Sequence, residues 1–304
     1  MTQSAERAYE LAALADHQNG LVSRAQLRAH GIGSDYVRNQ LRARRWQAWT
    51  RRVIGVTTGP LTTEQIAWLA VLDGGPNCVL AGLSALSRYG LSGFDVDRVQ
   101  TAVPKNGHGA RHALFVRREC RRLDASGVHP AKRPPTMRLS VAVIDALENM
   151  TSPLRGCALL AAVVQQRIVR SDALRGLVLD TATLRHRRTY LRMAGDIEGG
   201  AHSLTEIDFG RLAREAGVGR PIRQAVRLDR YGRRRYLDAE FGGFVAEVDG
   251  ALHLKPLAWW EDMFRQNEIV LAHKPVLRFP SVGIYLRRDQ VVAQLRAAAT
   301  RWGV

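Results

Sequence analysis

Cysteine is scarce in this 304-residue sequence, and its spacing argues against two classes of protein. Cys78, Cys120 and Cys157 lie far apart and form no CxxC pair. An odd, scattered set argues against a disulfide framework and against a cysteine-based zinc site. No apolar run approaches the length of a membrane span, and the N-terminus lacks the apolar segment of a secretory signal. We therefore expect a soluble, cytoplasmic protein that does not enter a membrane.

Acidic residues are too few to balance the basic ones. The chain has 28 acids against 45 bases, a net charge of +17 and a pI near 10.9. Residues 1–195 carry +14 (28 bases, 14 acids), whereas residues 196–304 carry only +3 (17 bases, 14 acids). Only four of the bases are lysines, a preference that G+C-rich coding also produces. The charge predicts a polyanionic partner, either nucleic acid or an anionic membrane surface.

The length predicts two or three domains, and 46% apolar with 24% charged residues is a globular composition. The periodicity of the apolar residues predicts a multidomain α+β chain. We expect a winged helix-turn-helix domain over residues 1–60, an α+β middle domain over 61–197 and an α/β domain over 198–304. Short strands are expected around residues 98–103 and 112–117 of the middle domain. The predicted order in the last domain is helix, three strands, a helix at about 258–272, strand and helix.

The first domain is predicted to contain three short helices and a hairpin. Apolar positions at helical spacing favour helices over three segments, residues 5–18, 23–30 and 34–45. Ser23 followed by Gln26 is a capping-box pattern, and Gly31 ends the second helix. Two helices joined by a glycine-containing turn outline a helix-turn-helix, and the alternating residues 46–57 follow as a wing.

An arginine stripe marks the third predicted helix. Val37 and Leu41 lie four residues apart and are expected to pack on the first helix. Arginine can form two hydrogen bonds with the edge of guanine, and asparagine can form two with the edge of adenine. Two arginines of the wing are placed to reach phosphates. The predicted DNA-binding residues are Arg38, Asn39, Arg42 and Arg45 on the helix and Arg51 and Arg52 in the wing. The alternative is a small helical domain with a solvated basic face.

A glycine pair in the last domain predicts a tight hairpin that opposes two acids. Gly242-Gly243 forms a two-residue turn between alternating strands. That turn places Asp238 directly opposite Glu247, with Cβ atoms about 5 Å apart, which is destabilising unless something compensates. Carboxylate oxygens are hard ligands, so a shared Mg²⁺ or Mn²⁺ ion is the expected compensation.

Other polar residues are expected near this pair. Asp249 follows Glu247 on the same face of its strand, and further candidates come from Glu206, Gln224 and His253. Such a cluster suits metal-assisted hydrolysis of phosphodiesters, in which the metal polarises the phosphoryl group and activates water. The alternative is that each acid pairs with an arginine, and three are close in the sequence, Arg223, Arg234 and Arg235.

Residues 203–302 resemble the PD-(D/E)xK nuclease superfamily, in particular the branch of very-short-patch-repair endonucleases and DUF559 domains. The resemblance rests on Glu206, Gln224, Asp238, the run Glu247-Val248-Asp249-Gly250 with His253, and Arg265-Gln266-Asn267 before PVLRF. It implies a restriction-endonuclease-like fold in which Asp238 and Glu247 hold Mg²⁺. The superfamily's lysine, two residues after the second acid, is Asp249 here. The repair branch uses histidines near this position, so His253 is the candidate substitute. Without a substitute, the expectation is a domain that binds a metal weakly or is inactive.

Residues 8–58 resemble the winged-helix domain of AbiEi-type antitoxins, on QNGLVSRAQLRAHGI and the wing. Residues 61–175 resemble the region that follows it, on AGLSALSRYGL and the IDALENM helix. The resemblance implies that the winged helix binds operator DNA and that a cognate toxin is a partner. Two hypotheses therefore stay open, a metal-dependent deoxyribonuclease and a non-enzymatic repressor, and RNA processing also fits the basic middle domain.

Overall fold

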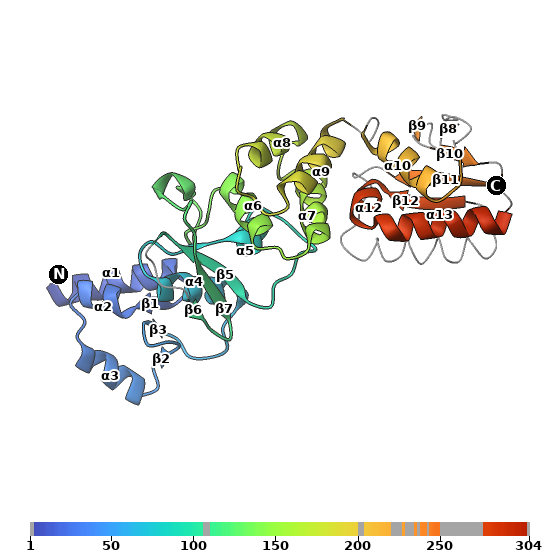
Figure 1. Cartoon of the computed structure of the whole chain (residues 1–304). Coiled ribbons are helices and arrows are strands. Elements are labelled where there is room, and N and C mark those ends of the chain that lie inside the picture. Colours follow the sequence, from blue (N-terminus) through green and yellow to red (C-terminus); the bar gives the residue numbers. More distant parts are fainter. Residues whose placement is uncertain are drawn as a thin grey trace. The chain divides into compact units, whose positions relative to one another are not determined.

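The computed structural model describes residues 3–105, 110–199, 204–219, 227–228, 234–235, 238–241, 243–249 and 276–302. The chain is a mixed α+β protein, as predicted (Figure 1). It divides into two compact units, Met1–Ala146 and Leu147–Val304. Within the described ranges, every helix is too short or too polar to span a bilayer.

The first unit opens with the predicted three helices and hairpin, here confirmed. The helices are α1 (Gln3–His17), α2 (Arg24–Ala29) and α3 (Ser34–Arg42). An antiparallel sheet accompanies them in the order β1 (Leu21–Ser23), β3 (Val53–Gly55) and β2 (Gln47–Ala48), of which β1 was not predicted. A small core holds these elements together through Ala15, Val22, Leu27, Val37 and Ile54.

Local chemistry fixes the boundaries of these helices. The capping box at α2 is present, because Gln26 N donates to Ser23 Oγ at 3.1 Å and Ser23 N donates to Gln26 Oε1 at 2.8 Å. Gly31 adopts φ 74°, a conformation that glycine tolerates without strain, and it turns the chain from α2 toward α3. The short connection therefore follows from residues that the sequence displays.

One helix, α4 (Thr63–Gly74), packs against two sheets at once. It contacts β1 and β3 of the first sheet and also strands of a second sheet. Its central residues from Ala67 to Val71 are all buried, so the helix is apolar around its whole circumference. Because α4 is shared, residues on both sides of the predicted boundary at residue 60 belong to one compact unit.

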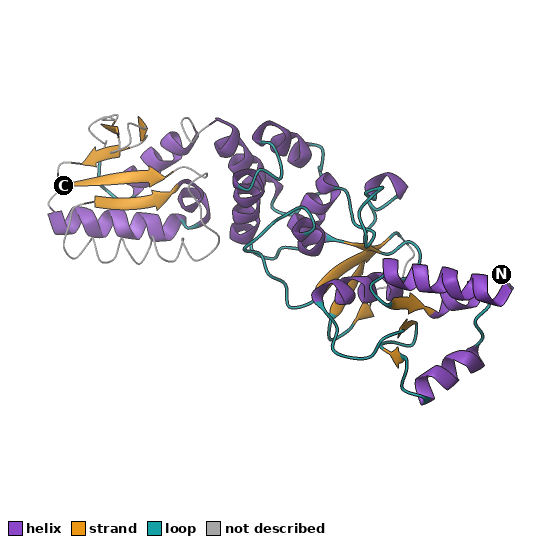
Figure 2. Cartoon of the chain, turned by 180° about the vertical axis from the view of Figure 1, so that it is seen from behind, coloured by secondary structure: helices purple, strands orange, loops and turns teal. Residues whose placement is uncertain are grey.

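The second sheet has the order β4-β5-β7-β6, with β5 and β7 parallel. Figure 2 shows its strands in orange. The strands are β4 (Val79–Leu80), β5 (Val99–Val103), β6 (Ala110–Arg111) and β7 (Phe115–Glu119). The remaining elements are α5 (Gly82–Ser87), the 3-10 turn η1 (Ala125–Gly127) and α6 (Leu139–Glu148), which leads into the second unit. The predicted strands at 98–103 and 112–117 correspond to β5 and β7, whereas β4 and β6 were not predicted.

The second unit begins with a helical layer. It comprises α7 (Pro153–Gln165), α8 (Ser171–Leu179), which was not predicted, and α9 (Arg187–Gly199). α9 packs on both other helices. A Cβ atom at Gly156 would lie 2.3 Å from the hydroxyl oxygen of Tyr190, so this close contact between α7 and α9 requires glycine.

The C-terminal part of this unit is a three-stranded sheet covered by helices. Its elements are α10 (Leu204–Glu215), β8 (Arg227–Leu228), β9 (Arg234–Arg235), β10 (Asp238–Phe241), β11 (Phe244–Asp249), β12 (Val276–Pro280), α12 (Ser281–Leu286) and α13 (Arg288–Trp302). The sheet order is β10-β11-β12, with β12 parallel to β11, while β8 and β9 pair separately. The helix predicted over residues 258–272 lies outside the described residues.

The helical layer and this sheet belong to one unit because α12 packs on α7 and α9. Tyr285 of α12 also donates a hydrogen bond to the sulfur of Met193 at 3.5 Å. The predicted division at residues 197 and 198 is therefore crossed by packing contacts. The assignment of three separate domains stays a prediction.

Candidate functional site

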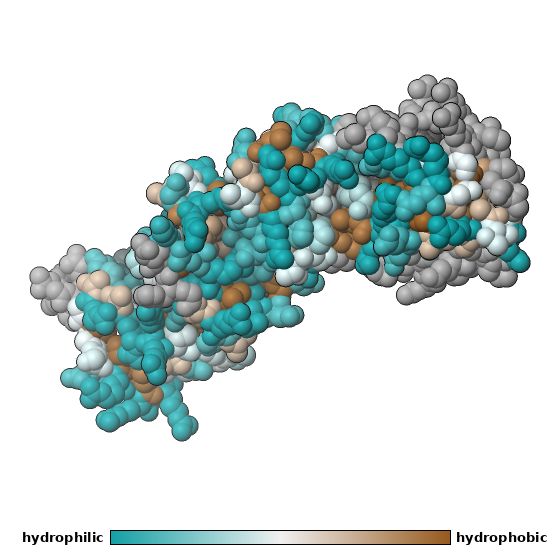
Figure 3. All heavy atoms as spheres, viewed as in Figure 1, coloured by the Kyte–Doolittle hydropathy of each residue, from teal (hydrophilic) through white to brown (hydrophobic). Residues whose placement is uncertain are grey.

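The outer face of α3 is basic and exposed. Val37 is 3% exposed and packs in the small core with Leu41 beside it, as predicted. Three predicted DNA-binding residues, Arg38, Asn39 and Arg42, are exposed on the remaining surface. Figure 3 shows that hydrophilic residues dominate the surface over α3. The helix thus combines one apolar face, which fixes its position, with one face that is free to meet a polyanion.

The predicted end of this helix at residue 45 is wrong, because α3 ends at Arg42. Arg44 adopts the left-handed conformation with φ 56°. Arg44 N donates to Leu41 O at 3.1 Å, and Arg45 N donates to Gln40 O at 3.1 Å. This pair of bonds is a Schellman motif, which terminates a helix. Arg45 is exposed, but it lies beyond the end of the helix, so the predicted stripe of Arg38, Arg42 and Arg45 stops at Arg42.

The sequence analysis did not identify two neighbours of the arginine stripe, the acidic residue Asp35 and the aromatic residue Tyr36. Arg38 Nη2 donates to Asp35 Oδ1 at 2.5 Å, and both side chains are exposed. Tyr36 is 53% exposed and packs edge-on against Trp46, with ring centroids 5.7 Å apart. Asp35 and Arg38 are three residues apart on a helix, a spacing that the sequence does display. Asp35 therefore neutralises part of the basic face.

The loop between β2 and β3 presents Arg51 and Arg52, both of them exposed. Arg52 Nη1 donates to the backbone oxygen of Asp73 near the end of α4 at 3.1 Å. The hydroxyl oxygen of Thr50 accepts hydrogen bonds from Arg52 N at 3.1 Å and from Val53 N at 3.0 Å. These bonds hold the loop in a defined position, so its two arginines are fixed relative to the sheet.

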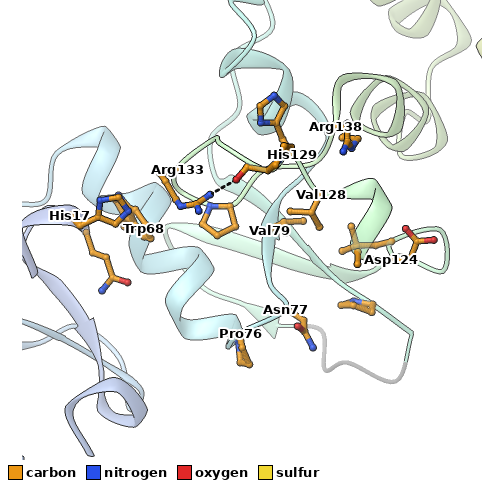
Figure 4. A pocket seen from close by; sticks show the side chains of 16 residues that line it. His17, Trp68, Pro76, Asn77, Val79, Asp124, Val128, His129, Arg133 and Arg138 are labelled. Carbon is orange, nitrogen blue, oxygen red and sulfur yellow. Dashed lines mark hydrogen bonds between the residues drawn. The ribbon is translucent and has the colours of Figure 1, made fainter. Parts of the chain in front are cut away.

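A cavity of about 900 Å³ in the first unit is lined by His17, Trp68, Asp124, His129 and Arg133, among others (Figure 4). Its polar groups are used by its own loops. Arg133 donates to the backbone oxygens of Pro130 and Lys132, and His129 Nδ1 accepts from the amides of Ala131 and Lys132. The Asp124 carboxylate accepts hydrogen bonds from Ser126 and Gly127, which lower its pKa. These side chains stabilise local turns, so we assign the cavity no ligand.

The predicted hairpin register of the two acids is confirmed. Asp238 pairs directly with Glu247, and Phe241 pairs with Phe244, across β10 and β11. A two-residue turn fixes the pairing of the strands that it joins, which is why the sequence sufficed. Gly243 lies against the C-terminal helix, since a Cβ atom there would be 2.2 Å from the backbone oxygen of Trp302.

The two faces of this sheet differ in chemistry. One face is buried in the core and carries Ala239, Phe241, Phe244, Ala246, Val248, Leu277 and Phe279. Successive residues of a strand alternate between faces, so positions 238, 240, 247 and 249 all belong to the opposite face. The backbone therefore brings four acidic positions together away from the core.

A basic position in the same row was missed by the sequence analysis. Glu247 pairs with Asp238 on one side and with Arg278 of β12 on the other. Across the three strands, the paired positions of this row are therefore an acidic residue, a second acidic residue and a basic residue. Arg278 is therefore a further candidate partner for an acid, in addition to the three arginines that lie close to the acids in the sequence. No sequence signal placed it there, because parallel pairing joins segments that are distant in the chain.

The remaining predicted site residues are placed only in part. Asp249 pairs with Pro280 across β11 and β12, and Glu206 lies in α10. Gln224 and His253 lie outside the described residues. Two adjacent carboxylate positions match the oxygen-rich donor set of Mg²⁺ or Mn²⁺, and the backbone register fits such an ion. The same register also fits an ion pair with Arg278.

No family model matches the chain, and no curated protein matches it. What the chain does is therefore inferred from its residues and their geometry.

Proposed function

We propose that this chain binds DNA through its first unit, as a winged helix-turn-helix protein. α3 is the recognition helix, and the loop between β2 and β3 is the wing. The observation that carries the proposal is the exposed row of Arg38, Asn39 and Arg42 on a helix whose other face is buried. Arg51 and Arg52 in the fixed wing loop support it, as does the net charge of +9 on the first unit (20 bases and 11 acids in residues 1–146).

Each group has a distinct role in this proposal. Arg38 and Arg42 present forked donors that suit guanine edges or phosphates, and Asn39 suits adenine. Arg51 and Arg52 contact phosphates and set the orientation on the duplex. Binding begins with the electrostatic attraction between the basic unit and the phosphate backbone, so affinity falls as salt rises.

Fluorescence anisotropy of the full chain with labelled duplex fragments tests this proposal at several salt concentrations. Arg38→Ala and Arg42→Ala should each weaken binding about tenfold. This is the loss of affinity expected when one bidentate pair of hydrogen bonds to a base is removed. The slope of log affinity against log salt should fall by about 0.9 for each phosphate that is no longer neutralised. Arg170→Ala removes an arginine whose side chain is 85% exposed in the second unit, and it serves as the matched control. Decreases in affinity no larger than the control's would refute the proposal. Tighter binding of an RNA duplex of the same sequence would reassign the polymer.

A second function, metal-dependent hydrolysis of DNA phosphodiesters, is proposed for the second unit, with a restriction-endonuclease-like fold. The direct pairing of Asp238 with Glu247 favours it. These two residues would hold Mg²⁺ or Mn²⁺, and the bound ion would polarise the phosphoryl group and activate water. Asp249 stands where the superfamily has lysine, so we assign the missing positive charge to Arg278, in the same row as Asp238 and Glu247.

Incubation of the protein with supercoiled plasmid, with Mn²⁺ or with chelator, tests the second function. Asp238→Asn and Glu247→Gln should abolish metal-dependent nicking. Asp172→Asn, an exposed acid of α8 in the same unit but outside the sheet, is the control that should retain it. If the wild-type protein shows no metal-dependent cleavage, the chain is the non-enzymatic alternative. That alternative is an antitoxin-like repressor, with operator DNA and a toxin as partners, and its DNA binding would survive both substitutions.

A further inference from the structure

A second cavity in the first unit lies between α2, the wing loop and the end of α4. Its volume is about 610 Å³, within the range of small-molecule sites. Four arginines line it, Arg24 and Arg28 from α2 and Arg51 and Arg52 from the wing loop. None of the described residues that line it is acidic. The described residues that line the cavity therefore carry four positive charges and no negative one.

Four positively charged side chains around one cavity favour the binding of an anion there. Like charges that share one site repel, and the repulsion grows where low-dielectric walls limit screening. The guanidinium group presents a planar fork of donors, which matches phosphate oxygens better than a point charge does. A phosphate bound among these arginines would relieve the repulsion and satisfy several donors at once.

The walls of the cavity are held in place before any ligand arrives. Arg52 donates to the backbone oxygen of Asp73, and its own carbonyl accepts a hydrogen bond from Arg24 N at 2.8 Å. Gln18 is 4% exposed, and its amide exchanges hydrogen bonds with Gln26 at 2.8 and 3.3 Å. The wing loop is thus tied to α2 and to α4, and a preformed site loses less entropy on binding.

The floor of the cavity is apolar. Trp68 and Val71 of α4 line it and are 5% and 4% exposed, together with Leu72, Pro76 and Pro135. A phosphodiester backbone gains nothing from such a floor, whereas the planar ring of a small molecule would bury apolar surface there. No residue of α3, which the structure describes in full, lines the cavity, so it is distinct from the proposed recognition helix.

We propose that this cavity binds a small phosphorylated molecule with a planar ring, in the chemical class of a nucleoside monophosphate. Its phosphate lies among the four arginines, and its ring lies on the floor beside Trp68. Because Arg51 and Arg52 belong to both the cavity and the wing, the bound ligand competes with DNA. This competition rests on the proposed function, whereas ligand binding does not.

Calorimetric titration of the full chain with the four ribonucleoside monophosphates tests the binding step. At least one should bind, and its nucleoside and inorganic phosphate should each bind at least tenfold more weakly. Substituting Arg24→Gln together with Arg28→Gln should weaken the nucleotide at least tenfold. Arg38→Gln on α3 removes one charge of the same unit outside the cavity, and it should leave nucleotide affinity unchanged. The ligand should also raise the unfolding temperature of the wild type but not of the double variant.

Three results would overturn the ligand site. They are no binding by any of the four nucleotides, equal binding by a nucleoside without phosphate, and undiminished binding by a folded Arg24→Gln/Arg28→Gln protein. Anisotropy in the presence of saturating nucleotide then tests the competition, and DNA affinity should fall. If nucleotide binds while DNA does not bind at all, the proposed function fails and the ligand site stands. If both bind without affecting each other, the shared role of Arg51 and Arg52 is wrong.

Discussion

Replacing Asp73 with alanine tests whether its ion pair with Arg117 stabilises the first unit. Arg117 Nη1 and Nη2 donate to Asp73 Oδ2 at 3.2 and 3.0 Å, and the two side chains are only 6% and 14% exposed. Removing the carboxylate leaves a guanidinium in the interior without this counter-charge, which costs about 3–5 kcal/mol. For a unit of this size each kcal/mol lowers the unfolding temperature by about 2–4 °C, so we expect a fall of roughly 6–20 °C.

Urea unfolding followed by circular dichroism, together with scanning calorimetry, measures this change. Glu64→Ala is the control, because its pair with Arg88 is 36% and 33% exposed and such pairs contribute less than about 1 kcal/mol. Asp73→Ala combined with Arg117→Met should recover most of the stability, since apolar replacement of both partners is close to neutral. A stabilising role of the ion pair is refuted if Asp73→Ala costs no more than Glu64→Ala, or if the double variant is no more stable than Asp73→Ala alone.

Three further predictions concern the basic face, the hairpin and alkaline pH. Asp35→Asn removes a negative charge and the exposed partner of an α3 arginine, so anisotropy should show severalfold tighter DNA binding; an unchanged affinity would contradict the role of α3. Gly243→Ala places a Cβ atom 2.2 Å from the backbone oxygen of Trp302 and should lower the unfolding temperature of the second unit, whereas Gly210→Ala, with open space around the added atom, should not. Burial raises the pKa of the Cys78 thiol from 9.0 to about 11, so above pH 9 the unfolded state loses a proton that the folded state keeps. Stability should therefore fall by up to about 1.4 kcal/mol per pH unit between pH 9 and 11, and urea unfolding of Cys78→Ala should show a shallower fall; an equally steep one would exclude this thiol as the cause.

Features set by neighbouring residues could be predicted from the sequence. The capping box at Ser23 and Gln26 forms as expected because it involves residues three apart. The pairing of Asp238 with Glu247 follows from a turn of known length between alternating strands. In both cases the residues that decide the geometry lie next to the feature that they decide.

Features set by distant or unusual contacts could not be predicted. Arg278 lies beside Glu247 only because β12 pairs in parallel with β11. α3 ends at Arg42 because Arg44 takes a left-handed conformation, for which an arginine carries no signal. The cavity arginines Arg24 and Arg28 have the sequence pattern of ordinary surface residues of α2, since their common site depends on how α2 packs beside the wing loop.

The burial of α4 sets the smallest fragment that can be prepared for DNA-binding work. Leu21 and Val53 of the first sheet pack in one cluster with Trp68 and Leu69 of α4 and with Phe115 of the second sheet. A peptide that stops at residue 60 would leave the first two side chains in water and would aggregate or fail to fold. A fragment that ends near Ala146 keeps the whole cluster covered, so the proposed recognition helix, α3, should be studied at that length.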